Sequence, residues 1–253
     1  MFEIVKESSL RIKTGLIILG VVLLVGLIDN KFITWFFLGI IMIFGVAEAM
    51  KLFQSERNFI FLVSGFTWIL AYFYPNPQDL VFLSVILFAS VLAYTKTFDK
   101  LLFLPLLYPL VSFLFLFSLY ISFGVGSLLW LLVVVAGADI GAYFVGKSIG
   151  KRVFCLTSPK KTLEGVIGGI IVATIFGVIF APSIYMIEMV AFVSFLVALA
   201  SVFGDLFESY LKREAGVKDS GDILPGHGGI LDRTDGYLFG GIVMFILLKL
   251  LVQ

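Results

Sequence analysis

The sequence predicts an all-α integral membrane protein with about nine transmembrane helices, and three observations support this fold class. First, 60% of the 253 residues are hydrophobic, only 14% are charged, and the mean hydropathy is +1.12. A soluble domain of this length needs far more surface charge. Second, the apolar residues fall into runs of about 17 to 25, the length that crosses a hydrocarbon core of about 30 Å. Third, the basic residues are distributed unevenly among the connections between these runs.

Nine apolar runs follow one another along the chain. They cover residues 13–29, 32–52, 58–74, 80–96, 101–122, 126–147, 165–186, 188–211 and 230–251. The first run follows Arg11 and Lys13 as in a signal peptide, but the polar residues 29–31 come next in place of a small-residue cleavage site. We therefore expect a retained helix. Stretches such as 128–135 do not alternate polar with apolar residues, which argues against a transmembrane barrel.

The distribution of positive charge predicts the topology. With nine helices and a cytoplasmic N-terminus, all but two of the 18 lysines and arginines lie on the cytoplasmic side, the two being Lys31 and Lys249. Cytoplasmic loops are enriched in these residues, and adding or removing a helix would scramble the division. We expect the C-terminus on the opposite side. We also expect two regions, helices one to five as a scaffold (1–125) and helices six to nine with their cytoplasmic loops as the catalytic region (126–253).

One polar stretch, Ser209 to Asp235, interrupts the hydrophobic sequence and contains the only histidine, His227. Its carboxylates include Asp219, Asp222, Asp232 and Asp235. Its cations are Lys212, Arg213, Lys218 and Arg233. Between them, residues 225–229 (Pro-Gly-His-Gly-Gly) permit positive φ and close approach of the backbone to an anion. A solvated linker is the alternative, but linkers rarely combine hard oxygen ligands, phosphate-binding cations and such a turn.

Further acids lie inside predicted helices. An acid in a membrane helix costs about 2.5 to 3.5 kcal/mol on insertion scales, so it usually faces a partner or a cavity. The spacing places Asp139 on the same helix face as Lys147. We expect Asp139 either to form a structural ion pair or to face an aqueous funnel. Asp205 shares a face with Ser209 near the end of the eighth helix. For Glu48 we expect a contact with Lys51 or the membrane interface, with a substrate role as the alternative.

The connection 147–165 carries five cations. Ser158 is a plausible N-cap and Pro159 a plausible first helical residue, which would put Lys160 and Lys161 at a helix N-terminus that favours anions. The alternative is an ordinary basic loop attracted to anionic headgroups.

Two motifs are similar to those of the phosphatidate cytidylyltransferases, also called CDP-diacylglycerol synthases. The longer motif consists of Ser209-x-Leu211-Lys212-Arg213, Lys218-Asp219 and Leu224-Pro225-x-His227-Gly228-Gly229-Ile230-x-Asp232-Arg233-Thr234-Asp235. The shorter one is 158–165 (Ser-Pro-Lys-Lys-Thr-x-Glu-Gly), in which Leu163 stands where an aromatic residue is expected.

The resemblance implies that CMP is transferred from CTP to phosphatidate, giving CDP-diacylglycerol and pyrophosphate for phospholipid biosynthesis. It implies a nucleotidyltransferase of the cell inner membrane that uses Mg²⁺ and faces the cytoplasm with its active site. Binding of a second metal or a monovalent cation, and assembly into a homodimer, are further possibilities. CTP, phosphatidate and the bilayer are the expected partners, and nucleic acid is not.

Carboxylates among many cations suit nucleotidyl transfer, in which positioning and charge neutralisation dominate. The predicted catalytic residues are Lys218, Asp219, His227, Asp232, Arg233 and Asp235. The predicted substrate-binding residues are Ser158, Lys160, Lys161, Ser209, Lys212, Arg213, Gly228 and Gly229. The predicted magnesium ligands are Asp219, Asp232 and Asp235, with Asp139 and Asp205 as further candidates.

Two other functions compete. One is another CTP-dependent membrane lipid enzyme, such as a CDP-archaeol synthase or a lipid kinase, which an acceptor panel would separate. The other is a cation-coupled transporter. Transporters carry their polar sites near the membrane midplane at the interface of repeats, whereas these acids gather on one side and the sequence has no internal repeat.

Overall fold

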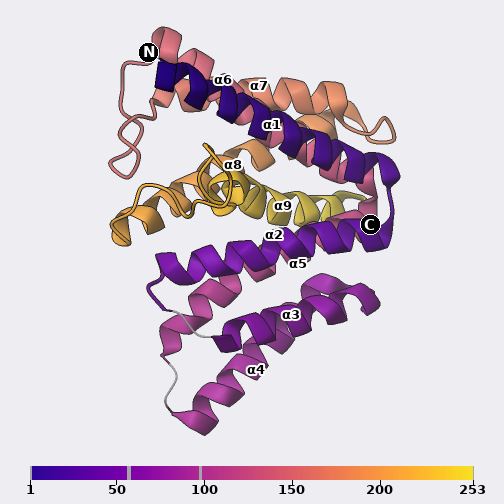
Figure 1. Cartoon of the computed structure of the whole chain (residues 1–253). Coiled ribbons are helices and arrows are strands. Elements are labelled where there is room, and N and C mark those ends of the chain that lie inside the picture. Colours follow the sequence, from indigo (N-terminus) through magenta and orange to yellow (C-terminus); the bar gives the residue numbers. More distant parts are fainter. Residues whose placement is uncertain (1, 56–57, 97–98, 253) are drawn as a thin grey trace. The chain divides into compact units, whose positions relative to one another are not determined.

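The computed structural model describes residues 2–55, 58–96 and 99–252. Within these ranges the chain is helical apart from connecting segments, and strand pairing is limited to two isolated bridges (Figure 1). The helices are α1 (Phe2–Ile28), α2 (Lys31–Leu52), α3 (Asn58–Phe73), α4 (Leu80–Thr95), α5 (Phe103–Phe123), α6 (Val125–Ile149), α7 (Leu163–Phe180), α8 (Ile187–Glu214) and α9 (Leu231–Val252). Short 3-10 helices, Pro77–Asp79 and Lys100–Leu102, precede α4 and α5. The predicted all-α class is confirmed.

Seven helical segments in the described chain are long and apolar enough to cross a membrane: α2, Pro77–Thr95, Lys100–Phe123, α6, α7, α8 and α9. Two shorter apolar helices, Lys13–Ile28 and Asn58–Phe73, correspond to the first and third predicted spans. The protein is thus a multi-pass membrane protein, while nine spans and their orientation stay a prediction. Arg57, counted among the cytoplasmic cations, lies outside the described residues.

The helix ends agree with the predicted runs to within a few residues, with two exceptions. The first helix, α1, begins at Phe2 rather than at residue 13. The seventh run was expected to reach residue 186, but α7 ends at Phe180. Pro182 follows two residues later, and proline cannot continue the hydrogen-bonding pattern of a helix. Residues 181–186 form the turn that leads into α8.

The chain divides into two compact units. The first comprises Met1–Phe117 and Glu214–Thr234, and the second comprises Ser118–Arg213 and Asp235–Gln253. The segment between α8 and α9, residues 215–230, therefore belongs with the N-terminal helices; it is called the signature loop below. The functional division between 1–125 and 126–253 stays a prediction.

In the first unit, α2 and α3 are joined by a reciprocal pair of tryptophan hydrogen bonds. Trp35 Nε1 donates to the carbonyl oxygen of Trp68 at 2.8 Å, and Trp68 Nε1 donates to that of Trp35 at 3.2 Å. The Trp68 ring lies against Gly39, where a Cβ atom would come within 2.9 Å of Trp68 Cδ1. The indole N–H groups find partners although Trp68 is buried, as buried tryptophans usually do.

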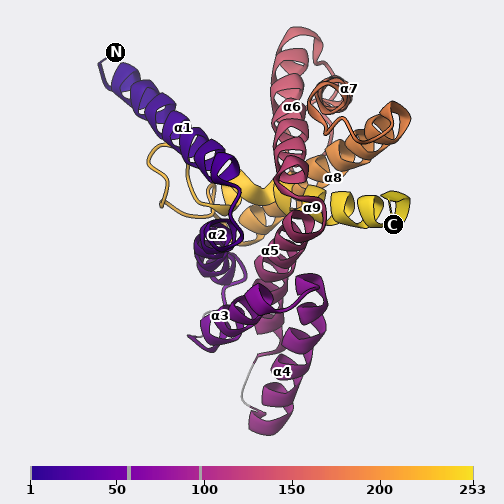
Figure 2. The ribbon, with the colours of Figure 1, turned by 90° about the vertical axis from the view of Figure 1, so that its right-hand side faces the viewer.

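In the second unit, α6 and α7 pack side by side through small residues (Figure 2). A Cβ atom at Gly141 would lie 2.9 Å from Gly169 Cα and 2.8 Å from Val172 Cβ. This approach is possible only without a side chain at residue 141, and small residues allow such close packing of membrane helices. Trp130 of α6 also donates through Nε1 to Ser194 Oγ of α8 at 2.9 Å.

Candidate active site

The signature loop contains the tight turn that its glycines predict. Gly226 and Gly228 adopt φ values of 74° and 78°, the left-handed region that favours glycine. Within this turn the amide of His227 donates to the Leu224 carbonyl at 2.8 Å, and the Leu224 amide donates to the Gly228 carbonyl at 2.9 Å. The chain reverses here, and residues 228–232 run back beside residues 219 and 220.

Asp232, in the first turn of α9, holds the two ends of the signature loop together. Its Oδ2 atom accepts hydrogen bonds from the amide of Ser220, the hydroxyl of Ser220 and the amide of Gly229, each at 2.8 Å. The Gly229 amide, predicted to face a phosphate, thus donates to Asp232 in the structure.

Glu48 of α2 takes part in the same network, which the sequence analysis missed. Its carboxylate accepts from Ser220 Oγ at 2.9 Å, from the Ile230 amide at 2.9 Å and from the Leu231 amide at 2.8 Å. The expectation of a contact with Lys51 or the membrane interface is wrong, because the Glu48 side chain is 1% exposed and its carboxylate accepts from these three groups. A lone acid in an apolar helix was the signal, but its spacing could not reveal a partner far along the chain.

Other predicted residues surround this network. Arg233 donates through Nε to the His227 carbonyl at 2.9 Å, so it supports the turn. His227 Nδ1 is buried and has no hydrogen-bond partner among the described residues. Asp219 and Asp232 approach each other at Gly228, where a Cβ atom would lie 3.4 Å from Asp219 Cβ and 2.8 Å from Asp232 Oδ2.

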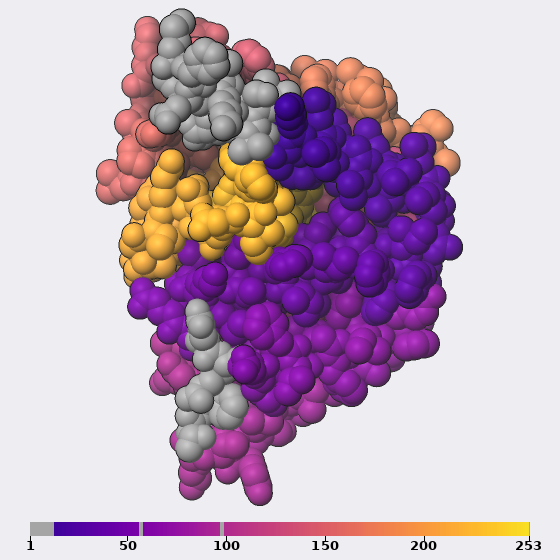
Figure 3. Space-filling model, viewed as in Figure 1, coloured from indigo at the N-terminus to yellow at the C-terminus, as the bar shows by residue number. Residues whose placement is uncertain are grey.

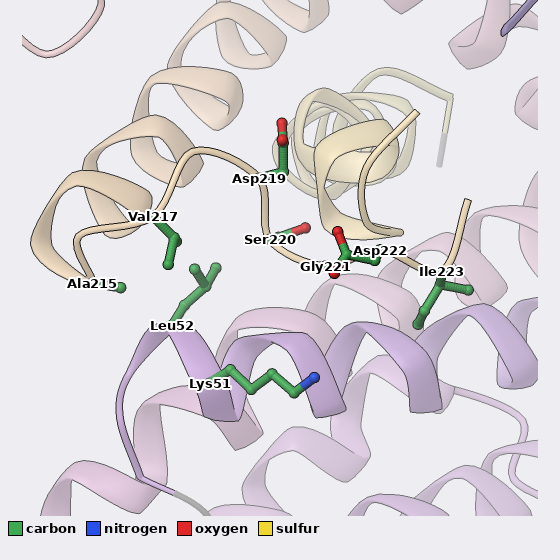
Figure 4. Close-up of a pocket in the computed structure, with 9 residues that line it drawn as sticks. All are labelled: Lys51, Leu52, Ala215, Val217, Asp219, Ser220, Gly221, Asp222 and Ile223. Carbon is green, nitrogen blue, oxygen red and sulfur yellow. The ribbon is translucent and has the colours of Figure 1, made fainter. Parts of the chain in front are cut away.

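A half-open hollow of about 510 Å³ lies between the end of α2 and the signature loop (Figure 4). Figure 4 shows the Asp219 side chain pointing away from α2, while the Lys51 side chain lies along α2 beneath the loop. In Figure 3 the golden atoms of the loop lie on the visible face next to purple atoms of the N-terminal helices. Lys218 and Asp219 are exposed. The lining residues are Lys51, Leu52, Ala215, Val217, Asp219, Ser220, Gly221, Asp222 and Ile223.

The second unit carries its own cluster of charged residues. Lys161 forms an ion pair with Asp205, which also accepts a hydrogen bond from Ser209 Oγ at 3.3 Å. Asp235 lies within electrostatic reach of Asp205, Glu208 and Asp139. The structure thus brings together Asp139, Asp205 and Asp235, three of the acids that the sequence analysis singled out.

Two further predicted residues lie on α8. Lys212 pairs with Glu208 one turn earlier, as their spacing indicates. Arg213 is exposed at the end of this helix.

The connection between α6 and α7, residues 150–162, is a hairpin rather than the start of a helix. The N-cap of α7 is Thr162, whose Oγ1 accepts from the Gly165 amide at 3.1 Å, so the predicted cap at Ser158 is wrong. Ser158 instead accepts the Lys161 amide through its carbonyl at 3.0 Å, and Lys160 is exposed. Threonine caps a helix through the same chemistry as serine, and pairing across the hairpin determines which of them does so.

Glu164 holds this hairpin in place. Its carboxylate accepts from the amides of Lys151 and Arg152 at 3.1 and 3.2 Å and from Arg152 Nε at 2.8 Å. Across the hairpin, the Phe154 amide donates to the Lys161 carbonyl at 2.8 Å. The predicted cations of this connection therefore lie on an ordered turn, and Lys161 extends from it to Asp205.

The carboxylates of each cluster fit Mg²⁺ that is also bound by a phosphate group. No group of three or more His, Cys, Asp or Glu side chains in the described part of the chain is spaced to enclose a metal ion. Mg²⁺ is usually bound by one or two carboxylates together with water and substrate phosphates, so it does not need such a cage. The carboxylates therefore suit a magnesium ion that shares its coordination with a phosphate ligand.

The fold and these clusters define a class: a multi-pass helical membrane protein with a cluster of acids and cations in each unit, suited to phosphate-bearing substrates. The chain belongs to the cytidylyltransferase family, which matches residues 9–251. It is 45% identical over 252 residues to the phosphatidate cytidylyltransferase of Helicobacter pylori (strain J99), across 98% of this chain and 94% of that protein.

More distant relatives carry the same name. The phosphatidate cytidylyltransferase of Bacillus subtilis is 42% identical over 168 residues, which cover 62% of this chain and 61% of that protein. That of Thermotoga maritima is 40% identical over 157 residues, which cover 58% of each.

Proposed function

We propose that this protein transfers the CMP moiety of CTP to phosphatidate and releases pyrophosphate. The observation that carries the proposal is the identity of 45% to a phosphatidate cytidylyltransferase over nearly the whole of both chains. The arrangement of Asp232, Ser220 and Gly229 supports it, because an ordered loop that presents carboxylates and cations suits phosphate chemistry.

In this reaction an oxygen of the phosphatidate phosphate forms a bond to the α-phosphorus of CTP. The bond from that phosphorus to the α,β-bridging oxygen breaks, and pyrophosphate leaves with the electron pair. A phosphomonoester is already an anionic nucleophile, so no basic side chain has to remove a proton. Positioning and charge neutralisation supply most of the rate in such transfers, and this accounts for a site made of carboxylates and cations.

Mg²⁺ belongs to the proposal, and it would neutralise phosphate charge when bound. Each unit offers carboxylates to hold it: Asp219 and Asp232 in the first, Asp235 with Asp205 and Asp139 in the second. The cations would contact the phosphates of CTP, phosphatidate and departing pyrophosphate. They are Lys160, Lys161, Lys212, Arg213, Lys218 and Arg233.

We further propose nine spans in a bacterial inner membrane, with the N-terminus, the 150–162 hairpin and the signature loop on the cytoplasmic side. The abundance of lysine and arginine in these segments supports this orientation. It would place the polar segments where CTP is available and leave the helices in contact with phosphatidate.

The test is turnover by the purified protein in lipid. With labelled CTP, Mg²⁺ and phosphatidate, we expect CDP-diacylglycerol and pyrophosphate in equal amounts. A lipid kinase would instead phosphorylate diacylglycerol and release CDP, and a CDP-archaeol synthase would prefer an ether-linked acceptor. Absence of CTP turnover with every acceptor would contradict the proposal and favour a transporter.

A further inference from the structure

We propose that Glu48 is a positioning residue of the transferase, which fixes the signature loop through Ser220 and the first amides of α9. Glu48 contacts no substrate in this proposal; it acts through Asp232 and the loop. The kinetic part rests on the proposed function, whereas the structural part can be tested without turnover.

The burial of Glu48 requires an explanation. Burying a carboxylate is costly unless hydrogen bonds compensate, and Glu48 is 1% exposed on an apolar helix. No cation lies within ion-pairing distance of it among the described residues. Its compensation comes instead from three donors of one segment, the Ser220 hydroxyl and the amides of Ile230 and Leu231. The favourable environment of Glu48 therefore depends on the position of the loop, and the position of the loop depends on Glu48.

The loop approaches Glu48 so closely that a side chain at either of two glycines would displace the Glu48 carboxylate from its present position. A Cβ atom at Gly229 would lie 2.5 Å from Glu48 Oε2, and one at Gly221 would lie 2.6 Å from Glu48 Oε1. Both distances are far below van der Waals contact. Glu48 is therefore enclosed by the loop on two sides, which distinguishes it from an acid that merely caps a helix.

Ser220 connects Glu48 to Asp232. Its hydroxyl lies 2.9 Å from Glu48 Oε2 and 2.8 Å from Asp232 Oδ2. A hydroxyl carries a single proton and can donate fully to only one of the two carboxylates at a time. A change at Glu48 must therefore alter the hydrogen bonding of Asp232, a predicted catalytic residue, although the two carboxylates belong to different helices.

The consequence for catalysis is preorganisation. Reacting groups have to be held to within about 0.5 Å of their productive positions, and loops do this less well than helices unless other residues support them. The signature loop carries Lys218, Asp219 and His227, and the structure anchors it through Asp232 and Glu48. Loss of Glu48 should therefore lower kcat more than it changes either KM.

The experiment compares Glu48→Gln, Ser220→Ala and the double variant with Met42→Ala. Met42 is a fully buried residue of the same helix, so it controls for general loss of packing. Hydrogen exchange in peptides covering residues 216–232, thermal unfolding and the kinetics with CTP and phosphatidate are measured on the full-length protein in lipid. Losing a charge-assisted hydrogen bond corresponds to about 10- to 150-fold in an equilibrium constant.

We expect Glu48→Gln to raise exchange in 216–232 by about tenfold or more and to lower kcat by a similar factor. In Met42→Ala, exchange in this segment should rise only in proportion to the lower melting temperature. The double variant should lose little more loop protection than the stronger single variant, because Glu48 and Ser220 share one contact. If Glu48→Gln does not fold, the same measurements on Ser220→Ala test whether the contact between Glu48 and Ser220 fixes the loop.

Unchanged exchange in 216–232, or additive effects of the two substitutions, would overturn the proposal. So would a loss of kcat in Glu48→Gln that matches that of Met42→Ala at equal destabilisation. If the wild-type protein does not turn over CTP, the proposed function fails, and the exchange data still decide whether Glu48 fixes the loop.

Discussion

At the scale of single residues, the charged groups of this protein act in pairs and networks. Asp205 is paired with Lys161, Glu208 with Lys212, and Asp232 with the donors of the signature loop. These three acids thus have partners that offset the cost of removing their charge from water. A substrate phosphate would have to compete with these carboxylates for the same cations, and this leads to predictions for individual side chains.

The first prediction concerns Lys160 and Lys161. Removing one charge-assisted contact to a phosphate should raise the KM for CTP about tenfold in Lys160→Gln and in Lys161→Gln. The ion pair of Lys161 is partly exposed, so its loss should lower the free energy of unfolding by less than about 1 kcal/mol. Steady-state kinetics and thermal unfolding check both values. Lys249→Gln, predicted on the other side of the membrane, is the control, and an equal KM change there would refute the assignment.

The second prediction compares two acids of the signature loop that both line the hollow. Asp219→Asn should raise the Mg²⁺ concentration needed for half-maximal activity, because it removes a hard anionic ligand while keeping the size of the side chain. Asp222→Asn, three residues further on and also exposed, should leave it unchanged. Titration of activity with Mg²⁺ after chelation distinguishes the two. Identical curves for both variants and the wild type would exclude Asp219 as a ligand.

At the level of the helices, the packing of α6 against α7 depends on glycines, which have no side chain. The helices α6 and α7 meet at Gly141 and Gly169, and in a bilayer such close contact supplies the attraction that the hydrophobic effect gives in water. The ends of these helices also fix the 150–162 hairpin, through Thr162 and Glu164. The position of Lys161 on this hairpin therefore depends on the packing of α6 and α7 within the second unit.

The third prediction tests this packing. In Gly141→Ala the new methyl group would lie 2.8 Å from Val172 Cβ, which the two helices can relieve only by moving apart. We expect a loss of about 1 to 3 kcal/mol in the free energy of unfolding, the usual cost of overpacking. The matched control is Gly20→Ala on α1, where a Cβ atom meets nothing within 4 Å. Equal melting temperatures for the two variants in detergent would contradict the packing argument.

For the molecule as a whole, two topologies differ in the number of helices that cross the membrane. Length and hydropathy identify seven spanning segments among the described residues and leave α1 and α3 as shorter apolar helices. Nine spans and seven spans both put the 150–162 hairpin and the signature loop on one side, because α7 and α8 separate them. The two counts differ for the connection between α1 and α2. Nine spans place it on the outer side of the membrane, and seven spans place it on the cytoplasmic side.

The fourth prediction uses this difference. With nine spans, a membrane-impermeant thiol reagent should label Cys155 only from the cytoplasmic side of sealed vesicles. In a Cys155→Ala background, it should label Asp29→Cys only from the opposite side. Seven spans would put both positions on the cytoplasmic side. Ser183→Cys, in the exposed turn between α7 and α8, should be labelled from the outer side under either count and serves as the control.

The sequence predicts the helical class, most helix ends, the left-handed turn at Gly226 and Gly228, and the motifs of the family. Each of these depends on residues that are close together in the chain, where hydropathy, spacing and glycine conformation act directly. It also indicated the small-residue faces of α6 and α7, because helical periodicity places those residues on one face.

Which polar groups meet depends on how the helices and loops pack in three dimensions. Glu48 and Ser220 are 172 positions apart, and Lys161 and Asp205 are 44 apart. Thr162 rather than Ser158 caps α7 because the hairpin pairs across residues 153 and 162. Helical periodicity shows which face of a helix is polar, but it does not show which segment packs against that face. That choice is made by packing and by the need of each buried charge for donors, and neither can be seen along a single segment.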